Sequence, residues 1–305
     1  MKAALLGLNI GGTTCSASIG TLDGDILKSA SWPSEAEKGP GHMIGRLITH
    51  SRELIAEAGA PLAVGAAVGG PMNGKSGVVL GPPNLPGWGH VPLADQLADA
   101  FQLPVRVEHD AVACALAEYL WGAKPTAERL AYLTCGTGFG VGLVIDGKPY
   151  YGAKGVPPEI GHVAYRENGP EAFGKRGCFE AFSSMPALQR LAAWRFPQRW
   201  GSNPPSPKEL DKFILHQDPA ALELLAIHAG AVGDAVALIV DLLGADRVLL
   251  GSASRYLGER WVELVRQRAK SQTGYWTDYE VAPASLGDRL QDCSALAAAY
   301  RAYRP

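Results

Sequence analysis

The feature that most constrains this fold is a glycine-rich strand–turn–strand pattern that occurs twice. Residues 131–147, AYLTCGTGFGVGLVIDG, are typical of an apolar strand, a tight turn around Thr137 and a second strand. Residues 5–24, LLGLNIGGTTCSASIGTLDG, follow the same plan, with Gly11 in the place of Gly136. The copies are 136 − 11 = 125 residues apart, which indicates a duplicated domain rather than a short repeat.

The turns of both copies have the composition of an anion-binding loop. Glycine allows positive φ and a close approach of the backbone to a ligand, and the adjacent threonine adds a hydroxyl. One such turn, taken alone, is equally consistent with an ordinary tight hairpin. The second copy favours a pair of phosphate-binding turns.

Composition limits the class of protein. The 305 residues suffice for two domains, and 47% hydrophobic with 19% charged residues is typical of a globular chain. A net charge of −2 gives no reason to expect nucleic acid or an anionic membrane as a partner. The five cysteines form no CxxC pair, so we expect reduced thiols and a cytoplasmic protein. The apolar run at the start is about eight residues long and predicts a buried strand, not a signal peptide, and we expect no membrane span.

The order of predicted elements indicates two α/β domains. We place the first at residues 1–108, completed by a C-terminal helix over 290–305, and the second at 109–289. Residues 70–90 are so rich in Pro and Gly that they predict a structured loop. Apolar periodicity predicts helices at 42–58, 93–101, 111–121, 209–216, 220–243, 257–270 and 294–303, and one that starts near Cys178.

Polar residues at a strand–helix junction suggest the chemistry. Glu108, His109 and Asp110 stand where a strand ends and a helix begins, which is where α/β folds place ligands. Asp110 could equally be the N-cap of the following helix, and both roles can coexist. Glu159, His162 and Glu180 are further polar residues in glycine-rich or apolar surroundings, a set that suits the hydroxyls of a polyol.

The whole chain resembles the ROK family of sugar kinases within the actin-like ATPase superfamily. The resemblance is carried by LNIGGT, PPNLPGW, EHDA, LTCGTGFGVGLVIDGK, EIGH, GCFEAF and SLGDRLQDCSALAAA. It implies a two-domain actin-like (ribonuclease H-like) α/β fold, with duplicated βββαβαβα units and an interdomain cleft.

The resemblance also implies roles for single residues. Asp110 corresponds to the catalytic base. The implied sugar contacts are Gly70, Asn84, His109, Asp110, Glu159, His162 and Glu180. The implied contacts to ATP are Asn9, Gly11, Gly12, Thr13, Thr14, Gly136, Thr137, Gly138 and Gly251, and Mg²⁺ accompanies the nucleotide.

Three features depart from the family pattern. Asn9 replaces an acidic residue that would orient the water shell of Mg²⁺, and we expect Asn9→Asp to raise turnover or lower the Mg²⁺ requirement. His109 replaces the asparagine before the base. The zinc motif Cys-x-Cys-Gly-x-x-Gly-Cys aligns with residues 171–178, where only Cys178 remains, together with His162. A structural zinc site needs four ligands, so we expect no structural zinc.

The sequence therefore predicts ATP-dependent phosphorylation of a hexose or N-acylhexosamine, most simply at the 6-hydroxyl, by a homodimer. Two alternatives stay open. A sugar-responsive repressor of the same family would need a DNA-binding segment before the first hairpin, which here begins within ten residues of Met1. A weak or non-catalytic sugar sensor would agree with Asn9 and the missing zinc ligands.

Overall fold

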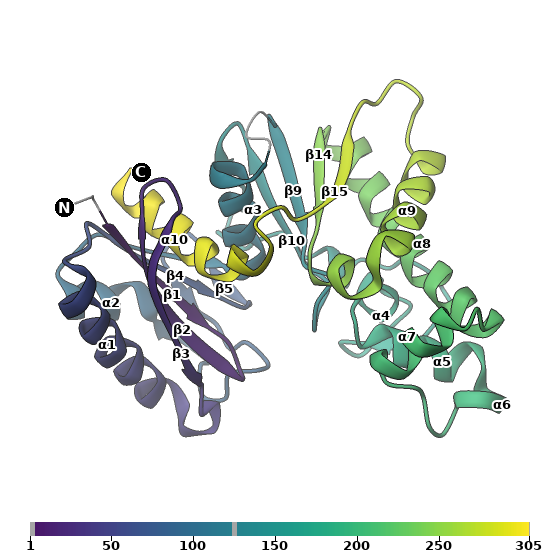
Figure 1. The fold of residues 1–305 in the computed structure, drawn as a ribbon, viewed down its shortest axis with the longest axis horizontal. Coiled ribbons are helices and arrows are strands. Elements are labelled where there is room, and N and C mark those ends of the chain that lie inside the picture. The colour runs from purple at the N-terminus through teal and green to yellow at the C-terminus, as the bar shows by residue number, and fades with distance from the viewer. Residues whose placement is uncertain (1–3, 124–126, 305) are drawn as a thin grey trace. The chain divides into compact units, whose positions relative to one another are not determined.

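The structure is a computed structural model that describes residues 4–123 and 127–304 (Figure 1). The chain divides into two compact units. The first unit comprises Met1–Ala127, Gly142–Pro158 and Ala284–Pro305, and the second comprises Glu128–Val141 and Glu159–Pro283. The domain boundary predicted between residues 108 and 109 is not the boundary of these compact units, and it stays a prediction.

The first unit is built on a five-stranded mixed sheet. Strands β1 (Ala4–Ile10), β2 (Thr14–Thr21) and β3 (Ile26–Pro33) are antiparallel neighbours, whereas β1, β4 (Val64–Val68) and β8 (Val105–His109) run parallel. The order is β3-β2-β1-β4-β8. Every described residue of β1 and β4 is buried, as expected for strands covered on both faces.

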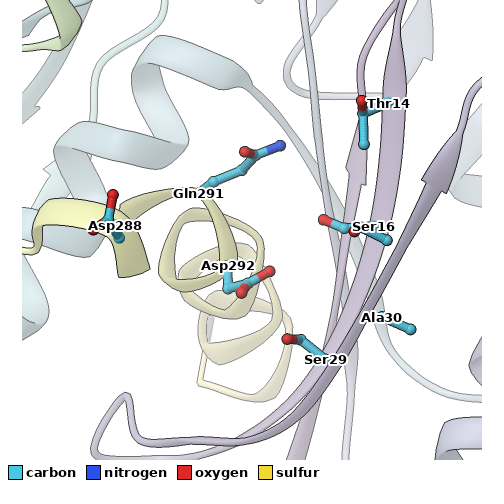
Figure 2. Close-up of a pocket in the computed structure, with 8 residues that line it drawn as sticks. Thr14, Ser16, Ser29, Ala30, Asp288, Gln291 and Asp292 are labelled. Atoms are coloured by element: carbon cyan, nitrogen blue, oxygen red, sulfur yellow. The ribbon is translucent and has the colours of Figure 1, made fainter.

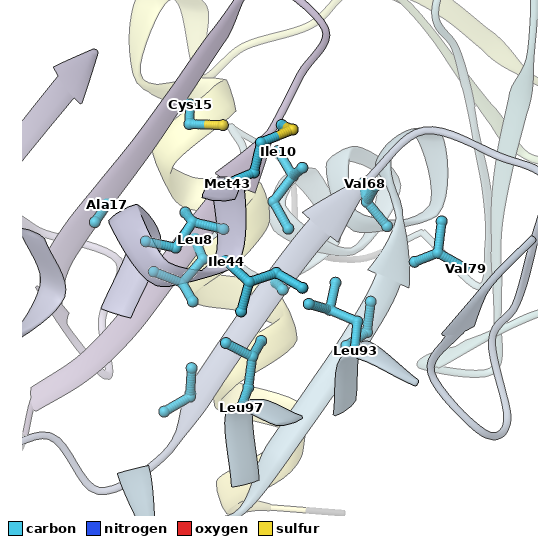
Figure 3. Packing of buried hydrophobic residues seen from close by; sticks show 14 of the residues in the cluster. Leu8, Ile10, Cys15, Ala17, Met43, Ile44, Val68, Val79, Leu93 and Leu97 are labelled. Carbon is cyan, nitrogen blue, oxygen red and sulfur yellow. The ribbon is translucent and has the colours of Figure 1, made fainter. Parts of the chain in front are cut away.

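One face of this sheet is covered by α1 (Gly39–Ala58) and α2 (Leu93–Phe101). Leu8 and Ile10 of β1 pack in one apolar cluster with Met43 and Leu47 of α1 and Leu97 of α2 (Figure 3). Met43 and Leu47 belong to the apolar positions of residues 42–58 that recur at three- and four-residue steps in the sequence. The predicted amphipathic helices are therefore confirmed here, with α1 starting three residues earlier than predicted.

The opposite face is covered by α3 (Asp110–Trp121) and α10 (Leu290–Tyr303), which contact each other. The backbone of α10 lies directly on β1 and β4. A Cβ atom on Gly7 would lie 2.8 Å from Leu296 N, and one on Gly65 would lie 2.1 Å from Ala299 N. Glycine in the strands and alanine in the helix therefore permit this close packing.

Shorter elements complete the first unit. The predicted structured loop contains a small antiparallel sheet of β5 (Met72–Asn73), β6 (Val78–Val79) and β7 (Val91–Pro92). Strands β10 (Val141–Ile145) and β11 (Lys148–Pro149) form a hairpin whose two turn residues, Asp146 and Gly147, both have positive φ. Two 3₁₀ turns occupy Ala36–Lys38 and Gly287–Arg289.

The second unit contains three parallel strands in its core: β14 (Arg247–Leu250) lies between β9 (Arg129–Leu133) and β15 (Glu280–Pro283). The parallel set β1, β4 and β8 of the first unit thus has a counterpart, and a glycine turn followed by an antiparallel hairpin comes after β9 as it does after β1. The repeat read from the sequence corresponds to this shared plan.

The helices of the second unit include two that the sequence analysis missed. Four helices agree with predicted ones: α4 (Phe179–Ser183), α7 (Pro207–Leu215), α8 (Pro219–Leu243) and α9 (Ser252–Gln272). Helix α9 starts five residues earlier than predicted, and a kink at Gly258 interrupts it. Helices α5 (Ala187–Arg195) and α6 (Pro197–Trp200) were not predicted.

Helix α8 is the central helix of the second unit. It begins at an Asp218 cap whose carboxylate accepts from Ala221 N at 3.1 Å, and it ends at Gly244 with φ 61°. By length and composition alone it could span a membrane, the one such helix in the described part of the chain, but two thirds of its most apolar window is buried. A buried core helix accounts for this composition.

A buried histidine joins three helices of the second unit. His228 Nε2 lies 3.1 Å from the Ser184 carbonyl oxygen, and His228 Nδ1 accepts from Trp261 Nε1 at 2.9 Å. The carbonyl requires a proton on Nε2 and the indole requires a lone pair on Nδ1, so the neutral tautomer is fixed. Burial lowers the pKa of His228 to about 4.

Candidate functional site

The parallel strands of the first unit bring three chain segments to one edge. Ile10 pairs with Val68, and Val68 with His109, at the carboxyl ends of β1, β4 and β8. The first glycine hairpin, the Gly69–Gly70 segment and Asp110 therefore leave the sheet together, at the edge where α/β sheets place ligands. A Cβ atom on Gly69 would lie 3.8 Å from Asp110 Oδ2.

Asp110 is the first residue of α3, and His109 is the N-cap residue. One carboxylate oxygen, Oδ1, accepts from Ala111 N at 2.6 Å, and 55% of the side chain is exposed. The prediction that Asp110 is the N-cap is therefore wrong by one residue, because His109 holds that position and the Asp110 carboxylate bonds to the next backbone N–H; its role as base stays a prediction.

His109 is mostly buried and lacks a hydrogen-bond partner at one ring nitrogen. Its side chain is 11% exposed, and Nδ1 is a buried atom for which the described residues offer no partner. Nδ1 lies 3.3 Å from Asp110 Oδ1 without hydrogen-bond geometry. Because a buried polar atom left unpaired costs about 1–3 kcal/mol, this nitrogen is suited to a ligand hydroxyl.

Glu108, which precedes these two residues, is fully buried in a hydrogen-bonded group. Its carboxylate accepts from Arg106 Nε at 2.8 Å and from the Tyr151 phenol. Burial, and then the charge of Glu108, raise the pKa of Tyr151 far above its usual range, so the phenol keeps its proton. The phenol oxygen in turn accepts from His109 N at 3.4 Å. Sequence analysis missed Tyr151, whose partner is 43 residues away.

The first glycine hairpin touches the loop that carries Asn84. A Cβ atom on Gly12 would lie 2.7 Å from the Asn84 carbonyl oxygen, so only glycine fits there. Thr13 and Thr14 are exposed, and Gly11 N donates to Thr14 O at 3.2 Å. The structure thus brings Asn84 next to the predicted phosphate turn. Gly70 lies next to Gly69 at the sheet edge and contributes only backbone.

The Asn9 side chain is held by the beginning of α10. Asn9 Nδ2 donates to the Gln291 carbonyl oxygen at 2.7 Å, and Ser294 Oγ lies 3.4 Å from Asn9 Oδ1. A carbonyl oxygen can only accept, so the amide orientation is set. This geometry explains why an amide suits position 9.

The second glycine hairpin is closed by its own threonine. Thr134 Oγ1 accepts from Gly140 N at 2.9 Å, and Gly136 N donates to Gly138 O at 2.9 Å, which leaves Thr137 exposed at the tip. Gly251 adjoins this turn, because a Cβ there would lie 2.4 Å from Thr134 O. The predicted nucleotide residues of the second unit are therefore adjacent.

Glu180 links the predicted sugar residues to this hairpin. Its Oε2 accepts from Phe139 N at 2.9 Å. Burial raises the pKa of Glu180, while the Phe139 hydrogen bond and the charges of Arg190 and His162 oppose the shift. A Cβ atom on Gly161 would lie 3.5 Å from Glu180 Oε2, so the Glu159–His162 turn lies against it. Glu159 and His162 are exposed.

The segment aligned with the zinc motif is a hairpin. Strands β12 (Glu171–Ala172) and β13 (Lys175–Arg176) are joined by Phe173 and Gly174, both with positive φ. The Phe173 ring stacks on His162, and buried Cys178 Sγ lies 3.6 Å from the Ala172 carbonyl oxygen. Within residues 4–123 and 127–304, no three His, Cys, Asp or Glu side chains are grouped as metal ligands. This donor set does not fit a four-coordinate zinc.

Comparison with known proteins identifies the class. The chain is 31% identical over 310 residues to a glucokinase of Thermotoga maritima, covering 98% of this chain and 96% of the relative. Its structure matches a ROK hexokinase from Thermus thermophilus with a TM-score of 0.86 and 30% identity, over 98% of both chains. A ROK family glucokinase from Streptomyces griseus, solved with glucose and AMPPNP, matches with a TM-score of 0.78 and 26% identity over 98% of this chain and 100% of that one.

These similarities define an ATP-dependent sugar kinase with the actin-like ATPase fold, which confirms the predicted fold class and enzyme class. Residues 5–300 match the ROK family, and the chain belongs to that family. The family also contains regulators. A putative xylose repressor of Caldicellulosiruptor sp. is 31% identical over 215 residues, which cover 68% of this chain but 54% of the repressor.

Proposed function

We propose that this enzyme transfers the γ-phosphoryl group of ATP to the 6-hydroxyl of a hexose or an N-acylhexosamine, with Asp110 as the general base. The observation that carries the proposal is the pair Asp110 and His109. One is a half-exposed carboxylate at a helix N-terminus, and the other is a buried imidazole without a partner at Nδ1. The similar glucokinase solved with glucose and AMPPNP supports a sugar and a nucleotide as the two ligands.

In this mechanism Asp110 Oδ2 accepts the proton of the attacking hydroxyl. Its partner oxygen, Oδ1, stays bonded to Ala111 N, so the carboxylate does not rotate away during the transfer. The proton moves to Asp110 as the sugar oxygen bonds to phosphorus and the bond from phosphorus to ADP breaks.

The remaining sugar hydroxyls are held by hydrogen-bond donors and by carboxylate acceptors. In the first unit, His109 Nδ1 and Asn84 offer polar contacts, and Gly70 offers backbone. In the second unit, Glu159 and His162 are exposed on one short turn, and Glu180 lies against that turn. Neutral donors and carboxylate acceptors together suit vicinal hydroxyls. A carboxylate buried like Glu180 gains most from a ligand hydroxyl, since burial disfavours its charge.

For the nucleotide, the two hairpins supply backbone N–H groups and the hydroxyls of Thr13, Thr14 and Thr137. Gly251 is the proposed adenosine contact beside the second hairpin. Mg²⁺, when bound, neutralises charge on the transferring phosphoryl group. We further propose a cytoplasmic homodimer.

The test is a coupled ADP-release assay over glucose, mannose, fructose, N-acetylglucosamine and N-acetylmannosamine. We expect sugar-dependent ADP release with one preferred sugar and a 6-phosphate product identified by NMR. A protein that binds one of these sugars in calorimetry but releases no ADP above the rate without sugar would instead be the sugar sensor, and the proposal would fail.

A further inference from the structure

A polar pocket of about 280 Å³ lies beside the first glycine hairpin, within the first unit (Figure 2). Strands β2 and β3 form one wall, and the beginning of α10 with the turn before it forms the other. The lining residues are Thr14, Ser16, Ser29, Ala30, Ser31, Asp288, Gln291 and Asp292.

The strand wall of the pocket is a surface of hydroxyl groups. Cross-strand pairing of Ser16 with Ser31 and of Ser18 with Ser29 places these side chains on one face, while Cys15 and Ala17 face the apolar core. Ser16 is 7% exposed, and its Oγ has no hydrogen-bond partner among the described residues. A hydroxyl of this kind, in the wall of a polar pocket, is left ready for a ligand.

The helix wall adds a carboxylate, that of Asp292, for which no ion pair is found within residues 4–123 and 127–304. Burial alone raises the pKa of Asp292, and no described residue is paired with its carboxylate. Asp288 is the other acidic residue of the lining. Keeping a desolvated carboxylate charged is unfavourable without a cation.

The donor set of the pocket consists of oxygens and one amide side chain. Carboxylate, hydroxyl and amide oxygens suit a hard cation. The pocket is much larger than a bare ion, and Mg²⁺ keeps several of its waters when proteins bind it. The chemistry of the lining therefore fits a hydrated divalent cation.

The pocket adjoins the proposed phosphate turn. Thr14 follows the Gly11–Thr13 turn directly, and Asn9 pairs with Ser16 across β1 and β2, so both side chains lie on the same face. Asn9 contributes no charge there, and its amide is bonded to the Gln291 carbonyl oxygen at the pocket wall. Asp292 supplies a carboxylate on the face where position 9 has none.

We propose that this pocket holds the hydrated divalent cation of the nucleotide, and that Asp292 is the acidic residue that replaces the one missing at position 9. The inference rests on the proposed function, because the cation arrives with ATP. It predicts that a charge on α10, and not on β1, determines the divalent affinity of the nucleotide complex.

The test measures Mn²⁺ binding by electron paramagnetic resonance, with a non-hydrolysable ATP analogue bound to the full chain. We expect Asp292→Asn to weaken Mn²⁺ binding about tenfold, as one charge is lost at a partly solvated site. Asp95→Asn, which removes an exposed acid of α2 on the other face of the same sheet, is the matched control and should bind Mn²⁺ like the wild type. Asp292→Ser is a second test variant, which also removes the charge and replaces Asp292→Asn if that protein fails to fold.

A second readout is independent of the nucleotide. In chelator, Asp292→Asn should melt no lower than the wild type, because it removes a desolvated charge. Wild-type Mn²⁺ affinity in both Asp292 variants would overturn the inference while leaving the kinase proposal intact. Absence of sugar-dependent ADP release by the wild type would instead reject the proposed function, which the binding experiment does not measure.

Discussion

The imidazole of His162 stacks on the phenyl ring of Phe173, with ring centroids 4.3 Å apart and planes 22° apart. Phe173 occupies a position that is a cysteine in the family's zinc motif. His162 corresponds to the histidine ligand of that motif. An aromatic stack therefore joins the two segments, and Lys175 Nζ adds a bond to the His162 carbonyl oxygen at 3.3 Å.

We predict that the purified protein carries no stoichiometric zinc and melts at the same temperature with and without chelator. Cys178 supports this prediction, because its thiol is buried and directed at two backbone carbonyl oxygens of the hairpin. Metal analysis by mass spectrometry checks it. One zinc per chain, together with unfolding in chelator, would show that the hairpin is a metal site after all.

The Phe173 ring should matter for the sugar. Phe173→Ala removes a stack worth about 0.5–1.5 kcal/mol, so His162 loses its orientation and KM for the sugar should rise several-fold with little change in KM for ATP. Phe173→Tyr keeps the stack and is the control. Equal rises in both Michaelis constants would point to a general loss of structure.

Asp110→Asn should lower turnover by about 10²-fold or more while sugar binding is largely kept. The amide preserves the size of the side chain and its bond to Ala111 N through Oδ1, but it cannot take the hydroxyl proton. Steady-state kinetics and calorimetric sugar binding measure the two effects separately. Turnover within a few-fold of the wild type would remove Asp110 from the role of base.

For Asn9→Asp the structure argues against the expectation from sequence. Asn9 Nδ2 now donates to the Gln291 carbonyl oxygen at 2.7 Å. In Asn9→Asp a carboxylate oxygen would take the place of Nδ2 and face that carbonyl oxygen without a hydrogen between them. We therefore predict a loss of about 1–3 kcal/mol in the free energy of unfolding and no gain in turnover. Denaturant unfolding and the Mg²⁺ dependence of turnover test this, and a stable variant with a lower Mg²⁺ requirement would restore the sequence-based expectation.

Acid should destabilise the protein through His228. Its pKa is about 4 in the folded chain, below the usual 6.5, so the unfolded chain binds the extra proton between these values. Stability is fully present above pH 6.5 and falls as the pH drops toward 4, by up to about 3 kcal/mol. His228→Gln keeps a donor for Ser184 and an acceptor for Trp261 without titrating, so its unfolding free energy should depend less on pH. An identical pH slope in both proteins would contradict the assignment.

A feature of this protein could be predicted from the sequence when the residues that define it are close together in the chain. Asp110 was predicted because an apolar strand, a charged triplet and a helix follow one another within a few residues. Helix α5 was missed although Leu188 and Leu191 are buried, because two arginines and one tryptophan within nine residues obscure the period.

The contacts that sequence reasoning could not supply join distant segments. Tyr151 donates to Glu108 across 43 residues, and Asn9 meets Gln291 across 282. No local pattern encodes such pairs. They depend on how β8, the segment after β11, and α10 pack, and they correct the expected effect of changing Asn9.

Helix α8 makes the order of synthesis a constraint on this protein. Its 25 residues are complete before β14 and α9 have been translated, and α9 is its main packing partner. The growing chain therefore passes through a stage at which the side of this apolar helix that packs on α9 is uncovered, although α4 and α5, translated earlier, can already cover other parts of it. Exposed apolar segments of this kind are the ones that aggregate or engage chaperones. Translation speed through the thirty residues after Leu243 should thus affect the yield of folded enzyme more than the same change elsewhere.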